Sequence, residues 1–92
     1  MNSVLIIDDD KELCALMKKC VEQENLSAVV AHGGLEGLRL LGENKDTCCL
    51  IILDVMMPGM DGFQVLQKIR EKNNVPVLML LSLIHISEPT RP

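Results

Sequence analysis

Aromatic residues are almost missing from this chain. Phe63 is the single aromatic residue among 92, and neither tyrosine nor tryptophan occurs, although 48% of the residues are hydrophobic. A folded core must therefore be built from leucine, isoleucine, valine and methionine. A chain of this length allows one small domain.

The chain also lacks a cluster of positive charge. Its formal net charge is -4, and no run of lysine and arginine is long enough to neutralise a series of phosphates. Binding of nucleic acid by this segment is therefore disfavoured, and any contact with DNA would need another domain.

No hydrophobic run is long enough to suggest a membrane span, which needs about 20 apolar residues. The most apolar stretch, residues 75–86, contains proline, serine and histidine. The amino terminus also lacks the basic and apolar pattern of a signal peptide. We therefore expect a soluble, cytoplasmic protein that makes no membrane contact.

The cysteines do not form a recognisable metal or redox motif. None of the four has the C-x-x-C spacing of a zinc or redox site. The spacing favours buried thiols in a reducing cytosol.

Two apolar runs end in aspartate. Residues 4–7 are followed by Asp8, Asp9 and Asp10, and residues 50–53 are followed by Asp54. Runs this rich in valine and isoleucine are typical of strands buried on both faces of a parallel sheet. Because ligands of such sheets bind beyond the carboxyl ends of the strands, we expect Asp8, Asp9 and Asp54 to lie together.

Three carboxylates in one crevice repel one another unless a cation lies between them. Oxygen ligands without histidine or cysteine suit Mg²⁺, which often meets a phosphate as well. The sequence therefore predicts a metal-assisted phosphate site.

Strand-like and helix-like periods alternate along the chain. This order predicts an α/β fold with a doubly wound parallel sheet, because right-handed crossovers place the helices on both faces. The expected strands are residues 4–7, 27–31, 48–53 and 75–80, and the expected helices are residues 11–24, 35–41 and 62–72.

The first expected helix has a clear cap and an apolar stripe. Asp10 is placed to cap its amino terminus, and for that reason is interpreted as a cap rather than a metal ligand. Helical spacing predicts one inward-facing stripe, made of Leu13, Leu16, Met17, Cys20 and Val21.

Two further features are given ordinary interpretations. His32 falls in a predicted turn and is expected to be solvated rather than to carry a phosphoryl group. The glycines at positions 33, 34 and 37 do not follow the first strand, so they do not match a dinucleotide-binding fingerprint.

The chain resembles the receiver domain of bacterial two-component response regulators. The resemblance is carried by VLIIDDDKEL, LIILDVMMPGMDGFQVLQKIR and VPVLML, and spans residues 1–80. It implies a flavodoxin-like receiver fold, whose full strand order is 2-1-3-4-5. It also implies a sensor histidine kinase as partner, and regulation of transcription through an output domain that this segment does not contain.

The resemblance also implies roles for individual residues. Asp54 would accept the phosphoryl group, while Asp8, Asp9, Asp54 and the backbone carbonyl of Met56 would hold Mg²⁺. The loop after the third strand would be shaped by Pro58 and Gly59, and Gly62 would allow the third helix a close start.

The resemblance ends after Leu80. The string LSLIHISEPTR, residues 81–91, resembles a translated sequencing-library adaptor, so we expect a receiver segment over 1–80 and a non-native tail over 81–92. The family's switch threonine or serine and its phosphate-pairing lysine would then be absent. Four lysines fall in the wrong elements to replace that lysine: Lys11, Lys45, Lys68 and Lys72.

An incomplete receiver has physical consequences. Without the fifth strand and the last two helices, most of the family's dimerisation surface is missing. Leu13, Leu16, Met17 and residues 77–80 would face water, so we expect an unstable or aggregation-prone chain with a sticky edge over residues 78–86. We also expect the fragment itself to be inactive.

Two alternative functions remain open at this stage. A phosphatase of the haloacid-dehalogenase type would use an Asp-x-Asp pair, which Asp8 and Asp10 could imitate, although Glu12 occupies a position where that motif has threonine or valine. A pseudo-receiver would keep the fold without being phosphorylated. A receiver itself is not an enzyme beyond its own phosphorylation and dephosphorylation.

Overall fold

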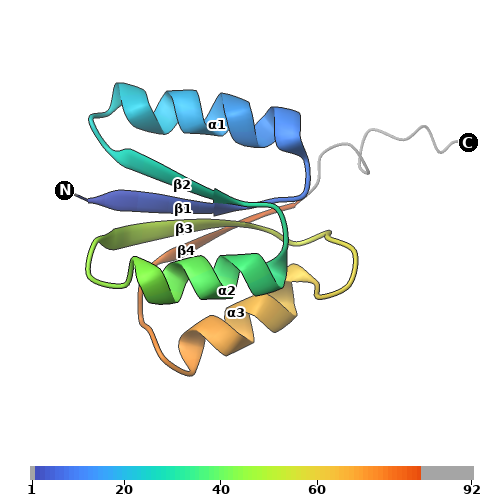
Figure 1. Ribbon diagram of the computed structural model, residues 1–92. Coiled ribbons are helices and arrows are strands. Elements are labelled where there is room, and N and C mark those ends of the chain that lie inside the picture. Colours follow the sequence, from blue (N-terminus) through green and yellow to red (C-terminus); the bar gives the residue numbers. More distant parts are fainter. Residues whose placement is uncertain (1, 82–92) are drawn as a thin grey trace, which may run out of the picture.

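Four parallel strands form the centre of the molecule. The structure, a computed structural model, describes residues 2–81. Its sheet has the order β2-β1-β3-β4 (Figure 1). The strands are β1 (Ser3–Ile7), β2 (Ser27–Ala31), β3 (Cys48–Asp54) and β4 (Val77–Leu80). The predicted doubly wound parallel sheet and its strand order are thereby confirmed over these strands.

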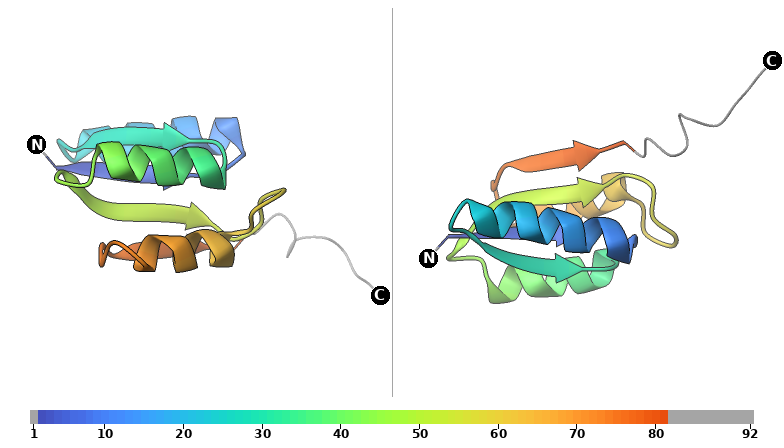
Figure 2. Two further views of the ribbon diagram at one scale, coloured as in Figure 1. Left: turned by 60° about the horizontal axis from the view of Figure 1, so that its bottom comes forward. Right: turned by 90° about the horizontal axis from the view of Figure 1, so that it is seen from above.

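Helices cover both faces of the sheet. They are α1 (Lys11–Gln23), α2 (Gly34–Glu43) and α3 (Gly62–Arg70). Helix α1 lies on one face over β1 and β2, whereas α2 and α3 lie side by side on the other face (Figures 1 and 2). Each predicted element exists, with ends that differ from the predicted ones by a few residues.

Alternate residues of the strands pack into two separate hydrophobic cores, one on each face of the sheet. On the side of α2 and α3, Leu5, Ile7 and Leu53 pack with Val65 and Ile69 of α3. On the side of α1, the buried residues are Val4, Ile6 and Cys14. Because strand side chains alternate between faces, the uninterrupted apolar run of β1 follows from burial on both sides.

The predicted inward stripe of α1 is partly wrong. Cys14 is the buried residue of this helix, and Met17 and Val21 are half-buried. Leu13, Leu16 and Cys20 are exposed instead. Helix α1 packs mainly on β1 and β2, and the residues that face the sheet are shifted by one position from the expected stripe.

The prediction of buried thiols holds only in part. Cys14 is buried and Cys48 is half-buried, but Cys20 and Cys49 are exposed. Spacing excludes a metal motif but does not determine on which face of an element a thiol lies.

Two glycines of α2 allow close packing. A Cβ at Gly37 would lie 2.5 Å from Cδ1 of Ile7 in β1, and one at Gly34 would lie 2.7 Å from Cγ2 of Val65 in α3. Both separations are too short for a side chain. The glycine pattern that does not match a nucleotide fingerprint therefore serves helix packing.

The fourth strand begins two residues later than predicted. The N–H of Val75 donates to the side chain of Asn73, 2.8 Å away, and Pro76 has no N–H to donate. Regular pairing therefore starts at Val77, whose partner in β3 is Ile51. The predicted tail, apart from Leu81, lies outside the described residues.

The helices can also be compared with the requirements of a membrane-spanning helix. Over residues 2–81, none of the helices combines the length and apolar character of a membrane span.

Candidate functional site

Three carboxylates meet at the carboxyl end of two neighbouring strands. Asp8 and Asp9 follow β1 directly, and Asp54 is the last residue of β3. Ile7 and Leu53, the residues before Asp8 and Asp54, pair in register across the two strands. Oxygens of Asp8, Asp9 and Asp54 all lie within 4.8 Å of one another. The structure therefore brings together the three aspartates that the sequence predicted to converge.

The two innermost carboxylates are held by backbone amides. Asp8 and Asp54 are buried, with 2% and 7% of their surface exposed, whereas Asp9 is exposed. The N–H of Asp10 donates to Oδ1 of Asp8 at 2.9 Å, and the N–H of Met56 donates to Oδ1 of Asp54 at 3.2 Å. Each amide fixes the orientation of a carboxylate next to its own strand end.

Burial and crowding change the titration of Asp8. Its pKa is raised from 3.8 to about 6, first because burial disfavours the charged form. The negative charges of Asp54 and Asp9 and a hydrogen bond with Asp54 contribute to the same rise, whereas the amide of Asp10 opposes it. A nearby cation would remove this repulsion.

The donor set fits a hard divalent cation. Only carboxylate oxygens converge, and one of the three groups is exposed, which leaves a side open for water. Mg²⁺ takes few carboxylates and retains several waters, so these residues are suitable ligands. Within the described residues, no histidine or cysteine joins this cluster of possible ligands.

Asp10 has a different role from its two neighbours. Its Oδ1 accepts from the amides of Glu12 and Leu13, both at 3.1 Å, and so caps α1. This is the predicted cap. The Asp8 and Asp10 pair is therefore not arranged as two converging ligands, which removes the geometric basis for a dehalogenase-type phosphatase.

The loop after β3 brings α3 close to the site. Met56 and Pro58 are exposed, and Gly59 has a φ of 80°, a left-handed conformation that favours glycine. At the start of α3, a Cβ on Gly62 would lie 2.5 Å from the backbone oxygen of Asp54. Glycine at this position thus lets α3 begin directly beside the site.

A capping box fixes the first turn of α3. The side chain of Asp61 accepts from the N–H of Gln64 at 2.9 Å, and the side chain of Gln64 accepts from the N–H of Asp61 at 3.0 Å. Both bonds satisfy amides that have no partner within the helix. They hold the carboxyl end of the loop that follows Asp54.

Two residues that sequence reasoning did not assign to the site contact its backbone. Sγ of Cys14 donates to the carbonyl oxygen of Asp8 at 3.3 Å, and Nδ1 of His32 lies 3.2 Å from the same oxygen. His32 is exposed, as predicted, yet it is anchored, since its N–H also donates to Glu36 at 2.9 Å. Because β2 neighbours β1, His32 lies at the same edge, but strand order alone does not place its ring on the carbonyl of Asp8.

The thiol of Cys14 contacts the backbone of Asp8, next to the carboxylate cluster. Burial, together with the negative charge of Asp8, raises the pKa of Cys14 to about 11. This thiol therefore stays protonated at neutral pH and can donate its hydrogen bond.

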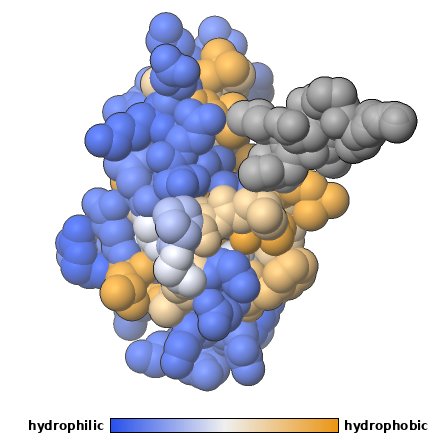
Figure 3. Space-filling model, turned by 90° about the vertical axis from the view of Figure 1, so that its right-hand side faces the viewer, coloured by the Kyte–Doolittle hydropathy of each residue, from blue (hydrophilic) through white to orange (hydrophobic). Residues whose placement is uncertain are grey.

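The surface at this edge mixes hydrophobic and hydrophilic residues. Figure 3 shows hydrophobic side chains gathered near the middle of this face, with hydrophilic ones beside them. Large apolar side chains that are exposed on the loop and on the first turns of α2 and α3 include Met56, Leu35 and Phe63.

Known structures share this fold. The Francisella response regulator 1452 receiver domain is 36% identical, with a TM-score of 0.80 over 90% of this chain and 68% of that one. The response regulator protein TrrA from Thermotoga maritima, in complex with Mg²⁺ and BeF, is 28% identical, with a TM-score of 0.81 over 95% of this chain and 75% of that one.

Curated relatives are transcriptional regulatory proteins. CpxR of Escherichia coli K12 is 42% identical over 80 residues, which cover 87% of this chain and 33% of CpxR. SrrA of Staphylococcus aureus is 40% identical over 79 residues, 86% of this chain and 32% of SrrA. The chain spans about a third of the length of these relatives.

A family profile agrees with the fold and with these relatives. The response regulator receiver domain profile matches residues 4–90, which is most of the chain. Together with the parallel sheet and the convergent aspartates, this match assigns the chain to the receiver domain family of two-component response regulators.

Proposed function

We propose that Asp54 accepts a phosphoryl group from a phosphohistidine of a sensor histidine kinase, in a reaction that depends on Mg²⁺. The observation that carries this proposal is the convergence of three carboxylates within 4.8 Å at one edge of the sheet. The kinase would be the partner, and the reaction would take place in the cytoplasm.

The chemistry needs a positioned nucleophile. A carboxylate oxygen of Asp54 attacks the phosphorus, a P–O bond forms, and the P–N bond to the kinase imidazole breaks. The product is a mixed anhydride, which water can hydrolyse. The amide of Met56 orients Asp54 for this attack through its bond to Oδ1.

The acidic residues hold the cation that this transfer requires. Asp8, Asp9, Asp54 and the backbone carbonyl of Met56 would be its protein ligands, with Asp9 binding directly and Asp8 largely through water. When bound, Mg²⁺ neutralises the carboxylates and the oxygens of the transferred group. Asp8 and Asp54 are buried, so their carboxylates are held in place at the strand ends.

The loop after Asp54 would respond to the modification. Phosphorylation adds about -1.5 to -2 charges, which can reposition neighbouring segments. Pro58 and Gly59 would shape this loop, and the N–H of Gly62 at its end donates to the carbonyl oxygen of Val55 at 3.0 Å. A movement of Asp54 would therefore be transmitted to α3, because the loop between them is short and α3 begins close to the backbone of Asp54.

The output of this domain would be control of transcription. CpxR and SrrA are named as transcriptional regulatory proteins, and the chain matches about a third of each. We infer that DNA is contacted by a part of the parent protein other than this segment.

The receiver segment would comprise residues 1–80. We infer that residues 81–92 derive from a sequencing adaptor, so that the switch hydroxyl and the phosphate-pairing lysine are missing and the fragment as given is inactive. Sequencing genomic DNA across the codon for Leu80 tests this inference. We expect continuation into a threonine or serine and a later lysine, and reads that encode LSLIHISEPTR would contradict it.

The phosphoryl transfer is tested on the chain with its native continuation after Leu80. Incubation with Mg²⁺ and acetyl phosphate should add the mass of one phosphoryl group, located at Asp54 by peptide mass spectrometry. Asp54→Ala should abolish the label, as should removal of Mg²⁺ by a chelator. Asp46→Ala, which changes an exposed aspartate in the loop before β3, is the matched control and should be labelled normally. Label that persists in Asp54→Ala would refute the assignment.

A further inference from the structure

A cavity of about 500 Å³ lies between the carboxyl ends of α2 and α3. Both helices end at the opposite edge of the sheet from the aspartates (Figure 1). Leu38 and Leu41 of α2 line the apolar part of the cavity. Close contact at Gly34 holds the amino ends of the two helices together, so this space opens where they end.

Positive charge surrounds this cavity. Lys45, Lys68 and Lys72 line it, with Glu71 as the single acidic residue. The local balance is thus three positive charges against one negative, in a chain whose net charge is -4. The sign of the charge at this place is opposite to that of the whole molecule.

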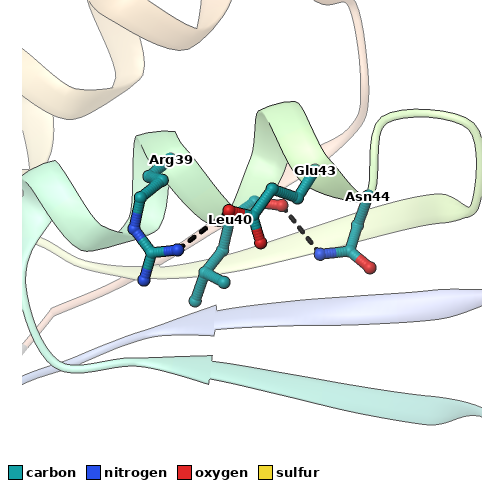
Figure 4. Close-up of polar contacts among 4 residues, drawn as sticks. All are labelled: Arg39, Leu40, Glu43 and Asn44. Atoms are coloured by element: carbon teal, nitrogen blue, oxygen red, sulfur yellow. Dashed lines mark hydrogen bonds and ion pairs between the residues drawn. The ribbon is translucent and has the colours of Figure 1, made fainter.

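The lysines have no ion-pair partner in the part of the chain that the structure describes. The one ion pair found there joins Arg39 and Glu43 of α2 at 2.9 Å (Figure 4). The side-chain amide of Asn44 donates to the carbonyl oxygen of Leu40 at 2.8 Å and completes the end of α2 (Figure 4). The polar contacts at the end of α2 are therefore made without these lysines.

The arrangement suits a protein segment. Small-molecule sites are enclosed and place rigid polar groups around the ligand. Here the cationic groups are flexible lysines that are exposed at the surface, around two leucines. An apolar centre with a charged rim is the usual anatomy of a protein interface.

We propose that this cavity binds an acidic segment of a partner protein, with one apolar side chain of that segment held between Leu38 and Leu41 and its carboxylates paired with Lys45, Lys68 and Lys72. The site is separate from the aspartates that hold the cation. Binding here would leave the phosphorylation site free.

The test uses ¹⁵N-labelled chain and a blocked pentapeptide that has one leucine flanked on each side by two glutamates. Titration should shift the amide signals of Leu38, Leu41, Gly42 and Lys68, and leave those of β1 unchanged. Raising the salt concentration should weaken binding, because the pairs are exposed. A peptide with serine in place of leucine should bind at least about tenfold more weakly, since a buried apolar side chain contributes about 1.5 kcal/mol or more.

Two variants separate charge from shape. The triple variant Lys45→Gln, Lys68→Gln and Lys72→Gln should bind the peptide about tenfold more weakly. Its matched control makes the same change of charge at the three exposed lysines of α1, which are Lys11, Lys18 and Lys19. The control should bind like the unmodified chain.

The second variant fills the cavity without changing charge. Gly42 lines the cavity, and a Cβ there would meet no atom within 4 Å. Gly42→Phe should therefore fold and reduce binding, whereas Gly42→Ala should bind normally.

Four results would overturn the proposal. These are amide shifts that map outside the cavity, equal binding of the serine peptide, equal losses in the two triple variants, and no shifts at millimolar peptide.

Discussion

At the scale of single residues, the aspartates could be predicted from sequence, but their neighbours could not. Asp8, Asp9 and Asp54 each follow an apolar run, so the rule for parallel sheets placed them together. Cys14 and His32 contact the backbone of Asp8 through atoms whose positions depend on helix rotation and strand order. A pattern of apolar and polar residues does not determine how a helix is rotated about its axis or which atoms meet at a strand end.

The raised pKa of Asp8 leads to a pH-dependent affinity for Mg²⁺. Because the pKa is about 6, the carboxyl binds a proton below that pH, and the cation must displace it. We expect the affinity for Mg²⁺ to fall by up to about tenfold per pH unit below pH 6, as measured by calorimetry. An affinity that is the same at pH 5 and pH 7 would contradict this.

The same shift has a consequence for stability without metal. Between pH 3.8 and about 6 the folded chain binds more protons at Asp8 than the unfolded chain. The free energy of unfolding should therefore decrease as the pH rises through this window. Asp8→Asn should remove that part of the pH dependence in urea denaturation.

Gly62 is predicted to be intolerant of any side chain. A Cβ there would lie 2.5 Å from the backbone oxygen of Asp54 and 2.7 Å from Cα of Val55, neither of which can rotate away. Gly62→Ala should lower the free energy of unfolding by about 1–3 kcal/mol. Gly42→Ala is the control, since its Cβ meets open space, and it should be neutral or stabilising by about 0.5 kcal/mol in urea denaturation. Equal effects of the two changes would contradict this account.

At the scale of elements, the sequence predicted which helices and strands exist and their order. It did not predict which side chains of a helix contact the sheet. Capping by Asp10 and the apolar runs of the strands indicate where elements begin. The side chains of α1 that touch the sheet depend on how the helix sits over β1 and β2. Leu13 and Leu16 are exposed for this reason.

The edge of the sheet at β4 is predicted to promote self-association. Leu78 is 52% exposed, and β4 has β3 as its one paired neighbour in the residues that the structure describes. Unpaired strand edges with apolar side chains favour association, and a lysine opposes it. Leu78→Lys should therefore lower the fraction of oligomer in sedimentation velocity. The matched change Gln67→Lys, at an exposed position of α3, should leave that fraction unaltered. An unmodified chain that is monomeric at high concentration would contradict the prediction.

At the scale of the whole molecule, one arrangement explains both the fold and the site. The alternation of strands and helices makes the sheet parallel, and a parallel sheet brings the ends of β1 and β3 to one edge. The cavity at the other edge could not be predicted, because it depends on how α2 and α3 pack around Gly34. The aspartate cluster therefore lies at one edge of the sheet, and a cavity lined by three lysines lies at the other.

The central claim is that Asp8, Asp9 and Asp54 form one divalent-cation site. Titration of the chain with Mn²⁺, followed by the electron paramagnetic resonance signal of the free ion, tests it most directly. We expect one ion to bind per chain, Mg²⁺ to displace it, and Asp9→Asn to weaken binding at least about tenfold. Asp46→Asn should bind as the unmodified chain does. Binding that is absent, or equal in Asp9→Asn and the unmodified chain, would contradict the account.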